Sequence, residues 1–307
     1  MTGGTAIGRV GVLAMAYGTP RDRDDIAAYY TDIRRGHPPT DEQLAALVAR
    51  YDALGGTFPL REITERQVDA LQAGLGARAP EQFTVVLGTK HSQPSIAEGV
   101  AALAADGIDR AVGVVLAPHW STVSVGQYAA RAAAAGEQHG VAVETIPSWH
   151  LLPAYVDFLA GAVTDALAEL PGAEVLFTAH SVPARVVEMG DPYPQQLRET
   201  AEAVAAQLDL PTWSIGWQSA GRTADPWLGP DVLEVVRDRA AAGSPGLVVC
   251  ACGFTADHLE VAYDLDIEAA RLARQLSLPF GRTRSVNADA AVLDGLAGLV
   301  FEAARLP

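Results

Sequence analysis

Short apolar runs alternate with amphipathic, alanine-rich segments along the whole chain. An apolar run bounded by turn-forming residues is typical of a buried strand, whereas apolar positions that recur once per helical turn indicate a helix. The runs predict strands at 11–20, 83–91, 111–120, 141–149, 174–183, 212–219, 247–252 and 280–286. The amphipathic segments predict helices at 24–33, 40–53, 63–75, 95–105, 125–138, 155–170, 194–208, 232–242 and 289–306.

This alternation of strands and helices predicts an α/β fold built from two similar doubly wound, Rossmann-like domains. Each domain is expected to hold a four-stranded parallel sheet flanked by helices, with a cleft between the domains. A chain of 307 residues is long for one domain, which also favours two. The boundary is expected between 1–150 and 151–307, with a hinge near 149–153. The helix at 289–306 is in a position to pack back on the first domain.

Composition narrows the classes of partner. The net charge of −15 argues against nucleic acid and anionic membrane surfaces. No apolar run reaches the length of about 18 residues that a membrane span needs, and the N-terminus lacks the apolar centre of a secretory signal. The two cysteines, Cys250 and Cys252, form no disulfide framework. We therefore expect a cytoplasmic protein and, since no dimer-forming element is evident, a monomer.

Unusual side chains follow the predicted strands at their carboxyl ends. They are Tyr17, Lys90, His91, His119, Trp149, His180, Trp217 and Gly253. Ligands of open parallel sheets bind at these ends, and two facing domains place them around one cleft. Lys90 is the only lysine among the 22 basic residues, which hints at a function, although a chance surface lysine explains it equally well.

An acidic repeat follows the strand at 247–252. Glu260, Asp264 and Glu268 are spaced by four residues, which stacks three carboxylates on one face of a helix and predicts a site that handles cations. Asp257, three residues before Glu260, also predicts a capping box, in which Glu260 has a purely structural role. A lone histidine such as His180 is more often structural too. Together, however, an imidazole and a carboxylate can take up protons or hold a divalent cation.

Several polar residues are candidates for anion binding. Arg34 and Arg35 follow a predicted helix, where arginine either complements the helix dipole or clamps a carboxylate. Ser121, Thr122 and Ser124 either donate hydrogen bonds to an anion or cap the next helix. Tryptophans that belong to the core or stack on a flat ligand are Trp120, Trp149, Trp217 and Trp227.

As a set, nine segments resemble the ferrochelatase family (class II chelatases), in its order and over nearly the whole chain. They are MAYGTP (15–20), YYTDIRRG (29–36), LGTKH (87–91), LAPHWST (116–122), TAHSVP (178–183), GDPYPQQL (190–197), GWQS (216–219), DPWLGPDV (225–232) and GFTADHLEVAYDLD (253–266). The resemblance is greatest to the coproporphyrin III ferrochelatases of Gram-positive bacteria. It implies an enzyme of haem biosynthesis that inserts ferrous iron into coproporphyrin III, giving coproheme.

The resemblance also implies roles for individual residues. His180 matches the family's catalytic histidine and Glu260 its partner, and together they bind the metal or accept the pyrrole protons. Asp264 and Glu268 match acidic residues that carry cations, including possible Mg²⁺. Tyr17 matches a tyrosine that faces the metal from the other side of the macrocycle.

The residues that the resemblance implies for porphyrin binding lie near the propionates or line the cleft. They are Tyr17, Arg34, Arg35, Lys90, Ser121, Thr122, Tyr128 and Trp217. Two features depart from the family. Phe58 stands where a serine that can bond a propionate is usual. Cys250 and Cys252 cannot supply the four thiolates of the [2Fe–2S] cluster found in some relatives. We expect no cluster and no tightly bound cofactor, with Fe²⁺ as a substrate.

Three alternatives remain at this point. The first is a chelatase that acts on protoporphyrin IX or inserts cobalt. The second is a non-catalytic protein of the same fold that binds a tetrapyrrole or delivers haem. A nucleotide-binding α/β protein is the third alternative. The absence of GxGxxG after the first predicted strand, where MAYGTP stands, argues against the last.

Overall fold

The computed structural model describes residues 9–56, 59–221 and 225–305. Its strands are β1 (Val10–Ala16), β2 (Phe83–Thr89), β3 (Arg110–Val115), β4 (Ala142–Thr145), β5 (Glu174–His180), β6 (Trp213–Gln218), β7 (Leu247–Cys250) and β8 (Phe280–Arg282). Its helices are α1 (Ile26–Ile33), α2 (Asp41–Ala53), α3 (Pro59–Arg78), α4 (Ile96–Ala105), α5 (Val125–His139), α6 (Pro153–Glu169), α7 (Ala184–Glu188), α8 (Tyr193–Gln207), α9 (Val232–Ala241), α10 (Leu259–Val261), the π-helix η1 (Ala262–Ala269), α11 (Ala270–Gln275) and α12 (Ala290–Arg305).

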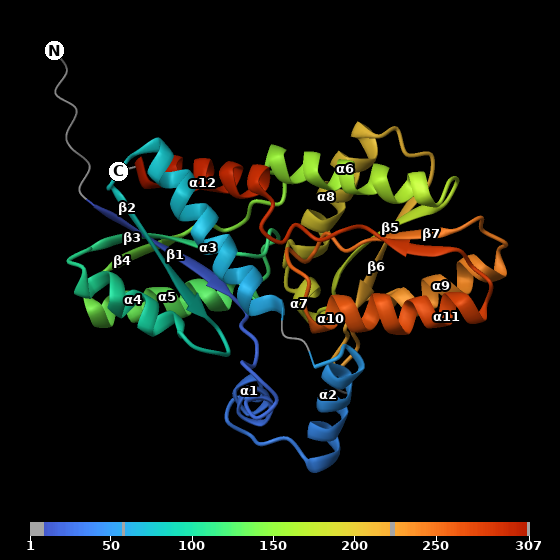
Figure 1. The fold of residues 1–307 in the computed structure, drawn as a ribbon, viewed down its shortest axis with the longest axis horizontal. Coiled ribbons are helices and arrows are strands. Elements are labelled where there is room, and N and C mark those ends of the chain that lie inside the picture. The colour runs from blue at the N-terminus through green and yellow to red at the C-terminus, as the bar shows by residue number, and fades with distance from the viewer. Residues whose placement is uncertain (1–8, 57–58, 222–224, 306–307) are drawn as a thin grey trace.

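The strands form two parallel four-stranded sheets with the same internal order, β2-β1-β3-β4 and β6-β5-β7-β8. The predicted α/β fold is therefore confirmed (Figure 1). The short helix α7, which lies between β5 and α8, was not expected from the pattern, because its five residues are too few to show a helical repeat.

Helices cover both faces of each sheet. Along β1, Val12 and Ala14 face α3 and α12, whereas Leu13 and Met15 face α4 and α5. Successive side chains of a strand point to opposite faces, so a strand covered on both sides needs an uninterrupted apolar run. The second sheet repeats this design, with α6 and α8 on the Phe177 face and α9, η1 and α11 on the other.

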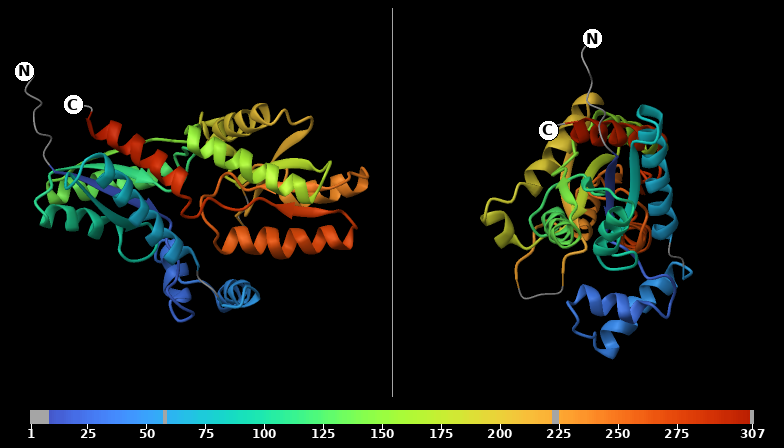
Figure 2. Two further views of the ribbon diagram at one scale, coloured as in Figure 1. Left: turned by 45° about the horizontal axis from the view of Figure 1, so that its top comes forward. Right: turned by 90° about the vertical axis from the view of Figure 1, so that its left-hand side faces the viewer.

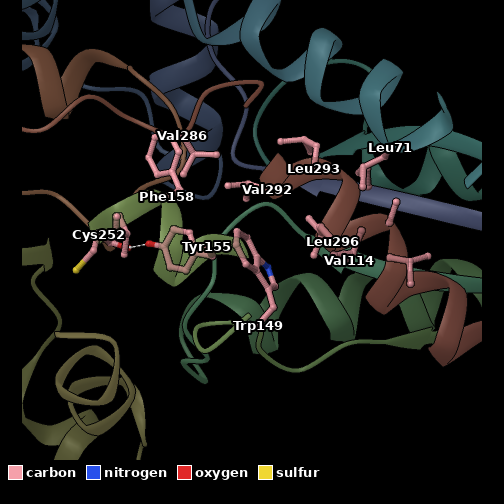
Figure 3. Close-up of a cluster of buried hydrophobic side chains, with 14 of the residues drawn as sticks. Leu71, Val114, Trp149, Tyr155, Phe158, Cys252, Val286, Val292, Leu293 and Leu296 are labelled. Atoms are coloured by element: carbon pink, nitrogen blue, oxygen red, sulfur yellow. Dashed lines mark hydrogen bonds between the residues drawn. The ribbon is translucent and has the colours of Figure 1, made fainter. Parts of the chain in front are cut away.

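A continuous core joins the two halves at the junction 146–152 (Figure 3). The Trp149 indole N–H donates to the carbonyl of Val115 at 2.9 Å, and its ring meets the edge of Tyr155, with 5.2 Å between ring centroids. The Tyr155 hydroxyl in turn donates to the carbonyl of Cys252. Trp149, at the start of the segment expected to be a hinge, is thus packed into the core, whereas Leu151 is exposed.

Helix α12 lies beside α3 over the first sheet (Figure 1). Arg78 binds both carboxylate oxygens of Asp294, at 2.6 and 2.9 Å. A Cβ atom on Gly74 would lie 2.9 Å from the Cβ of Ala297, so the two helices approach as closely as glycine allows. Residues far apart in the sequence therefore complete one layer.

Helices α1 and α2 project away from both sheets (Figure 2). Helix α2 begins with a capping box between Thr40 and Gln43. It reaches the second half through Arg50, whose guanidinium lies 4.8 Å from the centroid of the Tyr263 ring and 3.9 Å from Asp264 Oδ1. Within the described residues, no helix is long and apolar enough to cross a membrane.

Candidate functional site

The strand order places one functional edge in each sheet. Neighbouring strands β1 and β3, and likewise β5 and β7, lead their chains in opposite directions across the sheet. Ligands of such sheets bind outside the carboxyl ends at this switch point. Tyr17 follows β1, His180 ends β5, and Glu260 lies on the helix that follows β7. These predicted residues therefore lie at the two switch points.

His180 and Glu260 form a pair. His180 Nε2 lies 3.6 Å from Glu260 Oε1, and the two side chains are 37% and 40% exposed. The other ring nitrogen, Nδ1, lies 2.6 Å from the carbonyl oxygen of Ser181. A carbonyl only accepts hydrogen bonds, so Nδ1 carries a hydrogen and donates it. Nε2 is thus directed at Glu260 and open to solvent.

The pair is an ion pair at neutral pH. Burial alone lowers the pKa of His180, but the Glu260 carboxylate raises it to about 9. Burial raises the pKa of Glu260, but the His180 charge lowers it to about 2. A cation that binds between them must therefore displace a proton from His180.

Glu260 is held by a different cap from the one predicted. The Asp257–Glu260 capping box is wrong, since His258 caps α10. Its Nδ1 accepts from the backbone N–H groups of Glu260 and Val261, at 3.1 and 3.5 Å. The Asp257 carboxylate accepts instead from Arg282, the last residue of β8, and from Ser285 and Asn287 beyond it.

The acidic repeat does not lie on a regular α-helix. Asp264 and Glu268 belong to the π-helix η1, whose hydrogen bonds span five residues instead of four, so the expected α-helical stacking is wrong. Asp264 is buried and accepts a hydrogen bond from Ser219. Burial raises its pKa to about 6, although the Ser219 hydrogen bond opposes this rise.

The acidic residues do not close around an ion. Among the described residues, no three His, Cys, Asp or Glu side chains are placed to hold a metal together. His180 and Glu260 thus form a pair, with Asp264 and Glu268 further along the helix.

Aromatic rings surround the single lysine. Lys90 Nζ lies 5.9 Å from the centroid of the Tyr17 ring and 5.2 Å from that of Tyr128. Tyr17 is 43% exposed, whereas Tyr128 is buried. Burial, together with Arg131 and Arg35, lowers the pKa of Lys90 to about 8. Three predicted substrate-binding residues therefore meet here, and Arg35 is close enough to act on one of them.

His91 joins this group, although the sequence analysis assigns it no role. Its ring lies 4.7 Å from that of Tyr17, and Nδ1 lies 2.6 Å from Asp32 Oδ2 on α1. Arg34 caps the end of α1, and Arg35 follows with φ of 58°. Both arginines thus lie at a helix end, which is compatible with either predicted role.

The remaining predicted residues differ in their access to a ligand. Ser121 is fully buried and donates to Asp191, whereas Thr122 is exposed. Trp217 is buried beside Tyr193, so its ring is not at the surface. Phe58 lies outside the described residues.

The cysteines are buried in the core. Cys252 Sγ lies 3.8 Å from the carbonyl of Thr178, and burial raises the pKa of this thiol.

Two hollows border α2 instead of the His180–Glu260 pair. One, of about 360 Å³, is lined by Arg21, Asp22, Arg23, Ile26, Tyr51, Asp52 and Gly56. The other, of about 90 Å³, includes Tyr51, His258 and Leu259.

Solved structures of similar architecture include enzymes that act on tetrapyrroles. The sirohydrochlorin chelatase of Bacillus subtilis subspecies spizizenii, solved with cobalt, matches 97% of this chain and 97% of its own, with a TM-score of 0.56 and 11% identity. The terminal enzyme of sirohaem biosynthesis in denitrifying bacteria gives the same TM-score at 15% identity, with 97% and 100% covered. At these identities the likeness shows the fold, that of two-domain chelatases.

Sequence comparison identifies the family within this class. The Ferrochelatase family model matches residues 9–304. The ferrochelatase of Herpetosiphon aurantiacus is 42% identical, with 95% of this chain and 98% of the relative covered. The coproporphyrin III ferrochelatase of Halalkalibacterium halodurans is 40% identical, with 95% and 96% covered. The chain belongs to the ferrochelatase family, whose members are lyases that insert iron into a porphyrin.

Proposed function

We propose that this enzyme inserts ferrous iron into coproporphyrin III and releases coproheme. The His180–Glu260 pair is the observation that carries the chemical part of the proposal. Insertion of Fe²⁺ into a porphyrin releases two pyrrole protons, so the site must hold a dication and accept protons. A carboxylate that stays ionised, beside an imidazole whose proton an incoming dication displaces, provides both functions.

The order of events follows from the charges. In the empty site, His180 is protonated and paired with Glu260. An approaching Fe²⁺ repels the imidazolium, whose proton leaves to solvent through the exposed side of the ring. The neutral imidazole is then free to bind the metal or to accept a pyrrole proton. We further propose that Asp264 and Glu268 receive hydrated Fe²⁺ or Mg²⁺ before or after this step.

The choice of coproporphyrin III rests on relatives and on charge. Curated relatives at about this level of identity carry that name, including one from Geobacillus thermodenitrificans at 42%. Cationic side chains form two groups: Arg35 after α1 with Lys90 after β2, and Arg50 on α2. Arginine pairs readily with carboxylates. Coproporphyrin III carries four propionates, twice as many as protoporphyrin IX. It can therefore pair with both groups of cationic side chains.

The test is anaerobic incubation of the protein with Fe²⁺ or Co²⁺ and either porphyrin, followed by absorption spectroscopy. We expect the fastest conversion with Fe²⁺ and coproporphyrin III. His180→Ala is expected to abolish insertion while coproporphyrin III still quenches protein fluorescence on binding. Full turnover in that variant contradicts the role of His180. Faster conversion of protoporphyrin IX contradicts the proposed substrate, and binding without insertion by the wild type indicates a carrier.

A further inference from the structure

Four consecutive residues after β3 are attached to the second half of the molecule. His119 Nε2 lies 2.9 Å from Thr200 Oγ1. The backbone N–H of Trp120 donates to Gln196 Oε1 at 2.6 Å. Ser121 and Thr122 both donate to Asp191, in the turn before α8. The loop 119–122 of the first half is therefore fixed in register along α8 and its N-terminal turn.

Asp191 is the centre of this attachment. Asp191 is buried, with only 8% of its surface exposed. Oδ2 accepts from Ser121 Oγ at 3.1 Å and from the Thr122 N–H at 2.7 Å, while Oδ1 accepts from the Tyr193 N–H at 3.0 Å. Among the described residues Asp191 makes no ion pair, so these neutral donors offset the cost of its burial.

The two oxygens of Asp191 lead to different parts of the site. Oδ2 holds the backbone of Thr122, whose side chain is exposed and is a candidate propionate contact. Oδ1 holds the first residue of α8, Tyr193, whose ring centroid lies 5.8 Å from that of Trp217. Besides burial, Cys252, Asp191 and Glu260 raise the pKa of the Tyr193 phenol, which places Tyr193 within electrostatic reach of Glu260.

We propose that Asp191 is a positioning residue, which holds Thr122 where it meets a porphyrin propionate and sets its place relative to the second half. The inference rests on the proposed function, because the contact between Thr122 and the porphyrin is part of it. Asp191 itself does not touch the substrate. A shift of the loop 119–122 moves Thr122 away from the porphyrin but leaves His180 and Glu260 in place.

The decisive variant is Asp191→Asn. An amide keeps one acceptor oxygen, so the Thr122 N–H and the Tyr193 N–H can no longer both be satisfied. Loss of one buried acceptor corresponds to about a tenfold change in an equilibrium constant. We expect the Kd for coproporphyrin III, measured by fluorescence quenching, and its KM to rise about tenfold, while kcat for iron insertion stays within about twofold.

Glu199→Gln is the matched control. Glu199 also lies on α8 and bonds His150 of the first half at 2.8 Å, but it does not touch the loop 119–122. We expect unchanged porphyrin binding. An equal loss in both variants means that any loosening between the halves weakens binding, and it overturns the proposal, as does an unchanged Kd in Asp191→Asn.

A double-mutant cycle with Thr122→Val tests the route of the effect. This substitution removes the hydroxyl but keeps the backbone N–H that donates to Asp191. If Asp191 acts through Thr122, Asp191→Asn has little further effect on Kd in a protein that already carries Thr122→Val. Additive losses overturn the proposal. If Asp191→Asn does not fold, Ser121→Ala removes one donor to the same oxygen, and we expect a smaller loss in the same direction; an unchanged Kd there overturns the proposal.

These measurements separate the inference from the proposed function. Binding of coproporphyrin III by the wild type without iron insertion contradicts the proposed function, yet the Kd comparison still tests Asp191. Normal insertion by the wild type with an unchanged Kd in Asp191→Asn contradicts the positioning role alone.

Discussion

Replacement of Glu260 by glutamine should lower the pKa of His180 in the metal-free protein. Glutamine keeps the shape of the side chain but removes the charge that raises this pKa to about 9. The Ser181 carbonyl still accepts from Nδ1, so the ring keeps its orientation. The perturbation is therefore electrostatic, and its size follows from the geometry.

The separation of 3.6 Å between Nε2 and Oε1 sets the scale. Coulomb's law gives an attraction of about 1 kcal/mol at this distance in water and about 5 kcal/mol at the effective dielectric constant of a protein surface, about 20. Both side chains are more than one third exposed, so water screens the pair and the lower end of the range applies. We take about 1–2 kcal/mol, which lowers the His180 pKa by about one.

Histidine NMR measures this value directly. The chain has seven histidines, and loss of one signal in His180→Ala assigns the resonance. Asp266→Asn is the control, since it removes a carboxylate of η1 that binds Arg282 instead of His180. The His180 midpoint should fall in Glu260→Gln and stay in place in Asp266→Asn. An unchanged or higher midpoint in Glu260→Gln refutes the argument that this carboxylate sets the charge of the site.

Stability should change with pH in the corresponding direction. His180 has a folded pKa above the ordinary value of about 6.5, so its contribution is complete below that pH and is lost as the pH rises through about 9. Glu260 has a lowered pKa, so its contribution is present above about pH 4 and is lost as the pH falls toward 2. The difference in unfolding free energy between wild type and Glu260→Gln should therefore be greatest between about pH 4 and pH 6.5.

Two further predictions concern stability, measured as the urea concentration at the unfolding midpoint. Gly253→Ala should cost about 1–3 kcal/mol or more, because the new Cβ would lie 2.3 Å from the Cβ and 2.6 Å from the Cα of Ala179. Gly161→Ala is its control, since nothing lies within 4 Å of a Cβ there, and equal midpoints for the two variants contradict the steric argument. Tyr155→Phe should cost about 1–3 kcal/mol, because it leaves the buried carbonyl of Cys252 without this donor; wild-type stability would show that the carbonyl finds another partner.

Strand positions could be predicted from the apolar pattern, but strand ends could not. The run at 111–120 predicts one strand, whereas β3 ends at Val115. Residues beyond it leave the sheet yet remain packed against other elements, as buried His119 shows. Hydrophobicity reports burial, and a buried loop that follows a strand has the same signature as the strand. Two candidate site residues lie in such extensions, since Tyr17 follows the end of β1 and Lys90 follows the end of β2.

The candidate site could be predicted only as far as its signals are local. His180 and Glu260 could be found because each follows a strand, and the resemblance to a family pairs them. The residue that caps the helix of Glu260 could not be predicted, because the Asp257 carboxylate accepts a hydrogen bond from Asn287, 30 positions later. Asp191 was missed for the same reason, as its partners Ser121 and Thr122 lie about 70 positions earlier. Such competition between distant partners leaves no periodicity in the sequence.

The position of α12 has a consequence for how the protein is made. Arg78 and its partner Asp294 are 216 positions apart. A ribosome adds about 5–20 residues per second, so α3 emerges many seconds before the helix that lies beside it. Until residues 290–305 follow, the apolar side of α3 and the adjoining face of β1 lack one of their covers. The first sheet is thus synthesised early but completed late, and the nascent chain must be protected from aggregation during that interval.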